Sequence, residues 1–442
     1  MAETKPNISF IGLGAMGFGM ATNLVKLGYQ VTGFDVWPPT LEKFKAAGGS
    51  VATTPAEAVK DKDYCICMVA TAQQAQAVLI EGENPAITTL PKGAALLLCS
   101  TVPCAYVQSL EKELVDLGRG DIRLIDAPVS GGTGRAADGT LSIMAGGSDD
   151  ALEKGRVLLQ EMSDPKKLYI VRGGIGAGSN MKMCHQVLAA IQILAASEGL
   201  GFATQLGLDP QFASQAILKS DGWYFMFENR LPRMLDPEFK PIASAVSIIV
   251  KDTGIITSEA RRSGFPTPMT STAEQVYYSG LGQGYGPDDD SSLIRLYTEG
   301  KGKKIGAVKG LAETDESKLA LVVALLKGIC LCAAAEALVF AKKCKLDLDQ
   351  VFELCINAAG GSKMLQVVGP EIINLCRGIQ PSAADEEGLK DLAQQIQEAI
   401  DEAQRLKVPI HLGSQAFNLI RLALLQAPRD TPKATVAKVW GL

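Results

Sequence analysis

Three glycines near the amino terminus restrict how the chain can begin to fold. The segment FIGLGAMGFGM, residues 10–20, places Gly12, Gly14 and Gly17 in GxGxxG spacing between an apolar run and a helical one. In that context the first glycine permits a tight turn and the second lets the backbone approach a pyrophosphate. The third lets the helix pack closely on the strand. The spacing therefore predicts a dinucleotide-binding turn.

A second β-rich run, YQVTGFD, ends in Asp35, about twenty residues after the glycine turn, where an acidic residue can bind ribose hydroxyls. This carboxylate would repel the 2′-phosphate of NADP, and no arginine follows it in VWPP. We therefore expect NAD as the cofactor. The residues expected to bind it here are Gly12, Leu13, Gly14, Ala15, Met16, Gly17 and Asp35.

Residues 7 to about 170 alternate β-rich runs with helical segments. The expected strands are NISFIGLG, QVTGFDV, YCICMVA, AALLLCST, IRLIDAPV and LSIMAGG. This alternation predicts an α/β Rossmann domain, which is a doubly wound, mostly parallel sheet with helices on both faces. From about residue 176 the pattern becomes helical.

The helical part contains two segments that resemble each other. At an offset of 138 residues ASEGLGFATQLGLD (196–209) lies over AAEALVFAKKCKLD (334–347), and at 143 SEARRSGFPTPMTSTA (258–273) lies over DEAQRLKVPIHLGSQA (401–416). Chance similarity between two alanine-rich regions is the alternative, but matching across several helices favours duplication. We expect a Rossmann domain (1–172), a helical catalytic domain (173–300), a linker (301–317) and a second, degenerate helical copy (318–442). The catalytic domain and the second copy are then related all-α domains.

Composition and charge exclude several classes of function. The net charge of −5 gives no electrostatic basis for binding nucleic acid or an anionic membrane. No signal peptide is recognisable, and no uncharged apolar run reaches the ~18–20 residues that span a bilayer. The ten cysteines form neither CxxC pairs nor zinc-like clusters, so we expect reduced thiols, no metal and a cytoplasmic location.

Several motifs in fixed order resemble the β-hydroxyacid dehydrogenase family, which includes 3-hydroxyisobutyrate dehydrogenase and tartronate semialdehyde reductase. They are FIGLGAMGFGMATNL, DAPVSGGTGRAADGTLSIMAGG (126–147), GAGSNMKMCHQ, VKDTGI (250–255), GFPTP and GLGQGYGPDDDSS. The resemblance covers residues 7 to about 297. Within the family, His185-Gln186 and WYFMFENR (223–230) are most similar to the L-threonate dehydrogenases.

The resemblance implies a role for each matching residue. Lys182 corresponds to the catalytic lysine, and Ser130, Gly131 and Gly132 correspond to the loop that holds the substrate carboxylate. Thr101 and Lys251 correspond to residues lining the nicotinamide end of the cofactor. Gln186 stands where many relatives have an asparagine that contacts the substrate, so the chain departs from the family there.

The position of Lys182 indicates a catalytic role even without the resemblance. It begins a helix that is apolar almost all round, where burial and the positive end of the helix dipole both disfavour an ammonium. We expect its pKa to fall towards neutrality, as a general base requires. His185 and Gln186 follow at i+3 and i+4, on the same helix face, where they can orient a substrate hydroxyl. The alternative is a lysine that extends its charged end to the surface.

Three other functions share part of this pattern. The 6-phosphogluconate dehydrogenases share a lysine–histidine segment but place an acidic glutamate where this chain has Ala189, so oxidation without decarboxylation is preferred. Imine reductases usually replace the lysine. A non-catalytic dinucleotide-binding protein would not need the lysine or the carboxylate loop.

The second copy lacks the catalytic residues. Ala320, Val323 and Ala324 replace the residues at 182, 185 and 186, and Gln394 and Gln395 replace those at 251 and 252. In the resembled family, helical domains of two subunits pack together. We therefore expect residues 318–442 to pack against 176–297 in place of a partner subunit, in a monomer or homodimer.

Overall fold

The computed structural model describes residues 5–298, 315–380, 387–425 and 431–442. These residues form two compact units, Met1–Lys182 and Met183–Leu442. Most of the predicted linker, residues 301–314, lies outside the described residues. Its last part does not, because Asp315 caps helix α14, which begins at Glu316.

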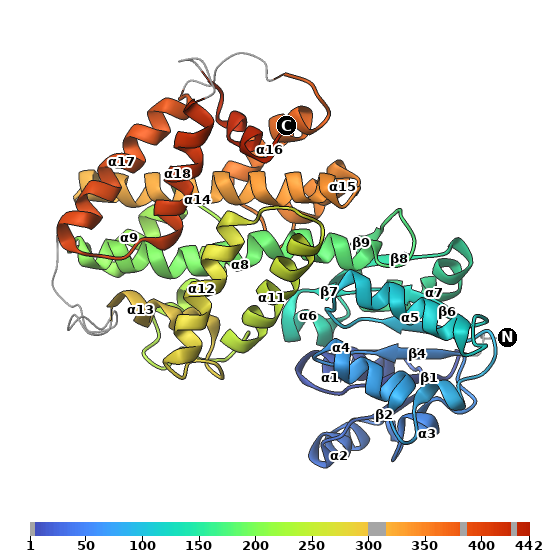
Figure 1. Cartoon of the computed structure of the whole chain (residues 1–442). Coiled ribbons are helices and arrows are strands. Elements are labelled where there is room, and N and C mark those ends of the chain that lie inside the picture. Colours follow the sequence, from blue (N-terminus) through green and yellow to red (C-terminus); the bar gives the residue numbers. More distant parts are fainter. Residues whose placement is uncertain (1–4, 299–314, 381–386, 426–430) are drawn as a thin grey trace. The chain divides into compact units, whose positions relative to one another are not determined.

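The first unit contains the predicted doubly wound sheet, shown as blue to green arrows in Figure 1. The strands lie in the order β3-β2-β1-β4-β5-β6-β8-β7, and β9 pairs with β8. Their bounds are β1 Ile8–Ile11, β2 Val31–Phe34, β3 Ser50–Val51, β4 Tyr64–Cys67, β5 Ala95–Leu98, β6 Arg123–Asp126, β7 Val129–Ser130, β8 Leu141–Gly147 and β9 Ser163–Ile170. Strands β1 to β6 are parallel, whereas β8 runs antiparallel to its neighbours β6 and β7, and β9 is parallel to β8.

All six expected strands are present, and three others had not been predicted. β3 and β7 have two residues each, too few for a periodic signal. β9 has the polar sequence SDPKKLYI, because it pairs with β8 alone and most of its side chains are not buried. The helices between the strands are α1 Ala15–Lys26, α2 Pro38–Ala46, α3 Pro55–Val59, α4 Ala72–Gln76, α5 Cys104–Asp116, α6 Gly132–Asp138 and α7 Asp149–Met162.

Helices cover both faces of this sheet, and each face has its own apolar cluster. On β4 the side chain of Ile66 belongs to one cluster, whereas those of Cys65 and Cys67 belong to the other. This alternation follows from the two-residue period of a strand. It also explains why YCICMVA has no polar face and why these cysteines are buried in a strand.

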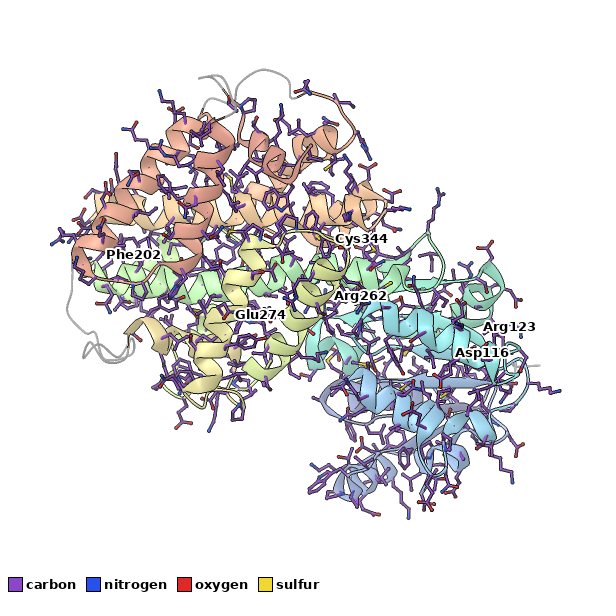
Figure 2. All side chains as sticks on the ribbon, viewed as in Figure 1. Asp116, Arg123, Phe202, Arg262, Glu274 and Cys344 are labelled. Atoms are coloured by element: carbon purple, nitrogen blue, oxygen red, sulfur yellow. The ribbon has the colours of Figure 1, made fainter. Side chains whose placement is uncertain are left out.

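In the second unit the described residues form helices and no named strand. Its helices are α8 Ala177–Gln205, which begins in the first unit, α9 Pro210–Leu218, α10 Phe225–Met234, α11 Val246–Arg262, α12 Pro268–Gly282, α13 Arg295–Thr298, α14 Glu316–Lys343, α15 Leu348–Ile356, α16 Lys363–Cys376, α17 Leu389–Leu406 and α18 His411–Leu425. By length and composition α8 and α14 could each cross a membrane, yet 100% and 94% of their most apolar windows are buried. Such burial is typical of core helices, and Phe202 of α8, labelled in Figure 2, is fully buried.

Two sets of contacts in this unit join positions that the predicted offsets relate. Tyr224 and Ser362, 138 residues apart, form an antiparallel bridge. The backbone N–H of Phe225 donates to Gly361 (2.8 Å), and that of Lys363 donates to Trp223 (3.0 Å). The two bonds exchange equivalent partners, as contacts across a two-fold axis do. The described part of residues 318–442 therefore packs on the first helical segment in a pseudo-symmetric way.

Two buried glutamates at equivalent positions form equivalent hydrogen bonds between the two helical copies. Glu198 on α8 accepts hydrogen bonds from the N–H groups of Leu412 (3.0 Å) and Gly413 (2.8 Å) at the start of α18. Glu336 on α14 accepts from the N–H groups of Met269 (2.8 Å) and Thr270 (2.9 Å) at the start of α12. Each carboxylate thus caps a helix of the other copy and satisfies backbone donors that would otherwise be buried without partners.

These glutamates predict a dependence of stability on pH. Burial raises the pKa of Glu198 and of Glu336 from 4.5 to about 7, although the N–H donors act against it. The folded protein therefore holds more protons than the unfolded chain between pH 4.5 and about 7, and its free energy of unfolding should fall as the pH rises through this window. We expect a slope on the order of 1 kcal/mol per pH unit for each group.

Thermal unfolding of the wild type and of a Glu198→Gln, Glu336→Gln variant at a series of pH values measures this contribution. The amides cannot ionise, so the slope in the window should be smaller for the variant. Parallel curves for the two proteins would contradict the expectation.

Candidate active site

The glycine turn lies between β1 and α1 and has the geometry that its sequence predicts. Gly12 has a φ of +93°, and a Cβ there would stand 2.2 Å from the Met68 carbonyl oxygen. A Cβ on Gly17 would stand 2.0 Å from the carbonyl oxygen of Gly12. Around Gly14, in contrast, no atom lies within 4 Å of a Cβ position. Gly12 and Gly17 therefore allow close packing, whereas Gly14 leaves open space beside the start of α1.

Asp35 follows β2 and is held next to this turn. Its Oδ2 accepts a hydrogen bond from the N–H of Leu13 (2.7 Å), and its Oδ1 accepts one from the N–H of Trp37 (2.9 Å). Each carboxylate oxygen keeps a second lone pair that can accept a hydroxyl. The neighbouring Val36 is 82% exposed, so position 36 has room for a larger side chain.

The predicted carboxylate loop follows β6 in the same unit. Ser130 ends β7, and Gly131 and Gly132 adopt φ values of +143° and +74° that a residue with a Cβ rarely adopts. Both glycines are exposed, so their backbone is accessible. Thr101 lies just beyond the carboxyl end of β5, half-buried.

Lys182 is buried with 5% of its surface exposed, as expected. The helix α8 begins at Ala177, however, so the lysine lies in the second turn and not in the first. The expected effect of the helix dipole on it is correspondingly weaker, because that effect is concentrated in the first turn. The burial on which the sequence argument also depended is present in the structure.

The start of α8 is fixed to the sheet by Asp126, a residue that had not been singled out. Asp126 ends β6 and is fully buried, and its carboxylate accepts hydrogen bonds from the N–H and the hydroxyl of Ser179, both at 2.7 Å. Burial raises its pKa to about 6, although the bonds to Ser179 oppose the shift. The sequence signal that could have identified Asp126 is an acidic residue at the end of an apolar strand, in IDAPVS.

In the second unit, His185 and Gln186 on α8 meet Lys251 and Asp252 on α11. Gln186 Nε2 donates to Asp252 Oδ2 (2.5 Å), and Gln186 Oε1 lies 3.0 Å from His185 Nδ1. The Lys251 ammonium forms an ion pair with Asp252 Oδ1 (3.1 Å). Asp252 was likewise not among the expected site residues, although VKDTGI contains it. The structure brings these four residues together.

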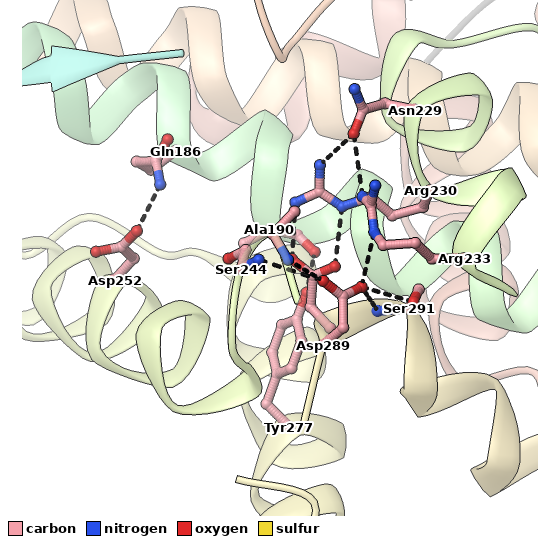
Figure 3. A network of polar contacts seen from close by, with 12 residues as sticks. Gln186, Ala190, Asn229, Arg230, Arg233, Ser244, Asp252, Tyr277, Asp289 and Ser291 are labelled. Carbon is pink, nitrogen blue, oxygen red and sulfur yellow. Dashed lines mark hydrogen bonds and ion pairs between the residues drawn. The ribbon is translucent and has the colours of Figure 1, made fainter. Parts of the chain in front are cut away.

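Residues of two other motifs, WYFMFENR and GLGQGYGPDDDSS, make structural contacts with each other. Arg230 of WYFMFENR forms a bidentate pair with Asp290 of GPDDDSS (2.9 and 2.7 Å). Arg233 pairs with Asp289 (3.1 Å), as Figure 3 shows. Asp289 also accepts from Ser291 and from the backbone at 243 and 244. Met226 and Phe227 are buried, which packing explains. These groups hold α10 to the segment after α12.

The described residues contain no group of histidine, cysteine and carboxylate side chains that could hold a metal ion. The ten cysteines are free, and all except the half-buried Cys344 are buried. Their burial is consistent with packing roles.

Comparison with known proteins links these features to one family. The model of the NAD-binding domain of 6-phosphogluconate dehydrogenase matches residues 7–174. The model of the NAD-binding domain of NADP-dependent 3-hydroxyisobutyrate dehydrogenase matches twice, at 176–297 and 317–440. The L-threonate dehydrogenase of Cupriavidus necator is 37% identical over 291 residues, which are 66% of this chain and 96% of that protein.

Two solved structures add to this. A 3-hydroxyisobutyrate dehydrogenase from Salmonella typhimurium has a TM-score of 0.60 and 31% identity, covering 66% of this chain and 100% of that one. A Plasmodium falciparum 6-phosphogluconate dehydrogenase has a TM-score of 0.59 and covers 96% of this chain and 94% of that one. At 15% identity this second likeness concerns the fold alone, but it extends over both helical segments.

Proposed function

Because the chain belongs to the β-hydroxyacid dehydrogenase family, we propose that it interconverts a small hydroxy acid and its oxo acid, with Lys182 as the general acid/base. The substrate is a 3-hydroxy acid or an aldonate such as threonate. The relatives named above support this class, and the enzyme is a nicotinamide-dependent oxidoreductase acting on a CH–OH group.

The observation that carries the proposal is the position of Lys182 in the first unit. The lysine follows Ser179 by one helical turn, and Ser179 is bonded to Asp126 at the carboxyl end of β6. Strands β1, β5 and β6 are parallel, so their carboxyl ends share one edge of the sheet. That edge also carries the glycine turn and Thr101, and in such sheets it is where ligands bind.

The described residues fit a nicotinamide dinucleotide. The open space at Gly14, beside the amino terminus of α1, suits a pyrophosphate, and Asp35 suits the ribose hydroxyls. Thr101 and Lys251 would line the nicotinamide end. When bound, the dinucleotide supplies the hydride acceptor.

The chain's own residues handle the proton and the carboxylate. In oxidation the Lys182 amine takes the hydroxyl proton while the C–H bond on the same carbon breaks and its electron pair leaves with the hydrogen. In reduction the ammonium returns a proton to the carbonyl oxygen. The Ser130 hydroxyl and the N–H groups of Gly131 and Gly132 bind the substrate carboxylate. We assign this reaction to a cytoplasmic monomer or homodimer.

A spectrophotometric screen tests the proposal. The purified chain is incubated with NAD and a panel of three- and four-carbon hydroxy acids, including L-threonate and 3-hydroxyisobutyrate, and the reduced cofactor is followed by absorbance. Oxidation of at least one acid without release of carbon dioxide is expected. Carbon dioxide release would instead indicate a decarboxylase, which the alanine at position 189 disfavours. Cofactor binding without turnover of any acid would indicate a non-catalytic protein.

Asp35 predicts the choice of cofactor. The wild type should have a higher kcat/KM with NAD than with NADP, on the order of 10- to 100-fold, because a hydrogen bond to a charged group contributes about 1.5–3 kcal/mol. Asp35→Ser combined with Val36→Arg should shift the preference towards NADP, and Val36→Arg alone is the control. Equal or faster wild-type turnover with NADP would refute the prediction.

A further inference from the structure

A chain of polar contacts in the second unit joins α8 to α11. It runs from His185 Nδ1 to Gln186 Oε1 (3.0 Å), from Gln186 Nε2 to Asp252 Oδ2 (2.5 Å), and from Asp252 Oδ1 to Lys251 (3.1 Å). Three of these side chains are buried, with exposed fractions of 0% for His185, 9% for Gln186 and 5% for Asp252. Figure 3 shows the bond from Gln186 to Asp252, apart from the arginine–aspartate network.

The direction of these bonds follows from the chemistry of the groups. The Asp252 carboxylate only accepts hydrogen bonds, so the NH₂ group of Gln186 faces it. The amide oxygen of Gln186 then faces His185, and an oxygen only accepts. The hydrogen between them therefore belongs to Nδ1 of the imidazole. In the neutral ring, Nε2 is then the acceptor.

We propose that Asp252 and Gln186 are positioning residues that hold His185 in the Nδ1–H tautomer, and that His185 Nε2 accepts a hydrogen bond from a substrate hydroxyl other than the one oxidised. The inference rests on the proposed function and narrows its substrate class. His185 follows Lys182 by three residues on the same helix, so both side chains lie on one helix face. An acceptor beside the catalytic lysine favours acids with a second hydroxyl over acids with an alkyl group there.

The assignment also accounts for the departure at position 186. Both polar ends of the Gln186 amide are used inside the protein, one by His185 and one by Asp252. In this chain the His185 imidazole therefore binds the substrate hydroxyl, and the Gln186 amide orients the imidazole ring.

The tautomer can be measured without any turnover. The chain has only two histidines, so long-range proton–nitrogen NMR spectra of the full-length protein with labelled histidine contain two imidazoles, and His411→Gln assigns them. Above the ordinary histidine pKa, His185 should carry its proton on Nδ1 in the wild type. Gln186→Leu removes the oxygen that accepts from Nδ1, and Asp252→Asn removes the carboxylate that orients the Gln186 amide. Both variants should therefore reduce the Nδ1–H population. An Nε2–H tautomer in the wild type, or an unchanged tautomer in both variants, overturns the proposal.

Selectivity is measured with two acids that differ by one hydroxyl, glycerate and 3-hydroxypropionate. The wild type should prefer glycerate in kcat/KM by on the order of 10- to 100-fold, the range expected when a buried hydrogen-bonding group is left unpaired. His185→Leu should abolish most of this preference, and Gln186→Leu should reduce it. A preference retained in His185→Leu overturns the inference while the proposed function stands.

Gln192→Leu is the matched control. Gln192 is also a buried glutamine on α8, but its Nε2 donates to the carbonyl oxygen of Gly360 (3.0 Å). This variant should lose stability while keeping the tautomer and the preference. The same loss of preference in Gln192→Leu as in Gln186→Leu overturns the positioning role. Absence of turnover with every hydroxy acid refutes the proposed function, and the selectivity with it, whatever the tautomer.

Discussion

Replacing Lys182 with alanine is expected to lower kcat by roughly 10²–10⁴-fold and to leave the affinity for the cofactor nearly unchanged. The reason is that the lysine handles the substrate proton, whereas the glycine turn and Asp35 hold the dinucleotide. The variant should also lose the limb of the pH–rate profile that reports the general base. Steady-state kinetics across pH and a titration with the reduced cofactor measure the two effects separately.

Two further variants separate catalysis from packing. Lys182→Arg keeps a cation but cannot act as a base at neutral pH, so it should be about as inactive as the alanine variant. Lys327→Ala removes another buried lysine of a core helix, one that pairs with Glu387 at 2.8 Å, and should cost stability but little kcat. If Lys182→Ala kept most of the wild-type turnover, the lysine would be structural and the proposed mechanism wrong.

Shortening the chain to residues 1–300 is expected to cause aggregation or dimerisation and to weaken substrate binding. The deletion removes α14, whose Leu326 contacts Gly199 of α8, and exposes a core face. Burying one large apolar side chain contributes about 1.5–3 kcal/mol, so the cost of exposing several of them is comparable to the whole stability of a typical domain. Size-exclusion chromatography with light scattering measures the outcome.

The reciprocal caps suggest how a shortened chain would pair. Glu198 would lose α18, and the start of α12 would lose Glu336, so in a homodimer each Glu198 can cap α12 of the other chain. Adding Glu198→Ala to the shortened chain should therefore weaken the dimer. A soluble, monomeric and fully active protein of residues 1–300 would contradict the expectation that the second copy replaces a partner. Cofactor binding at two sites per full-length chain would contradict the loss of chemistry in that copy.

Much of the fold could be predicted from sequence because its signals are local. The glycine turn depends on backbone conformation within a few residues, and the φ of Gly12 and the close contact at Gly17 bear this out. The six expected strands and the helical remainder follow from the pattern of apolar and polar residues. The burial of Lys182 could likewise be predicted, because it stands near the start of a helix that is apolar almost all round.

The interactions that orient the candidate site were decided only by the tertiary structure. Asp126 meets Ser179 across 53 residues, Asp252 meets Gln186 across 66, and Glu198 meets Gly413 across 215. The spacing of residues in a sequence does not show which distant groups a carboxylate will contact. Its role depends on which donors the fold leaves buried and unsatisfied within hydrogen-bonding distance. The sequence determined which groups can do the chemistry; the packing of distant helices determined which carboxylates hold them in place.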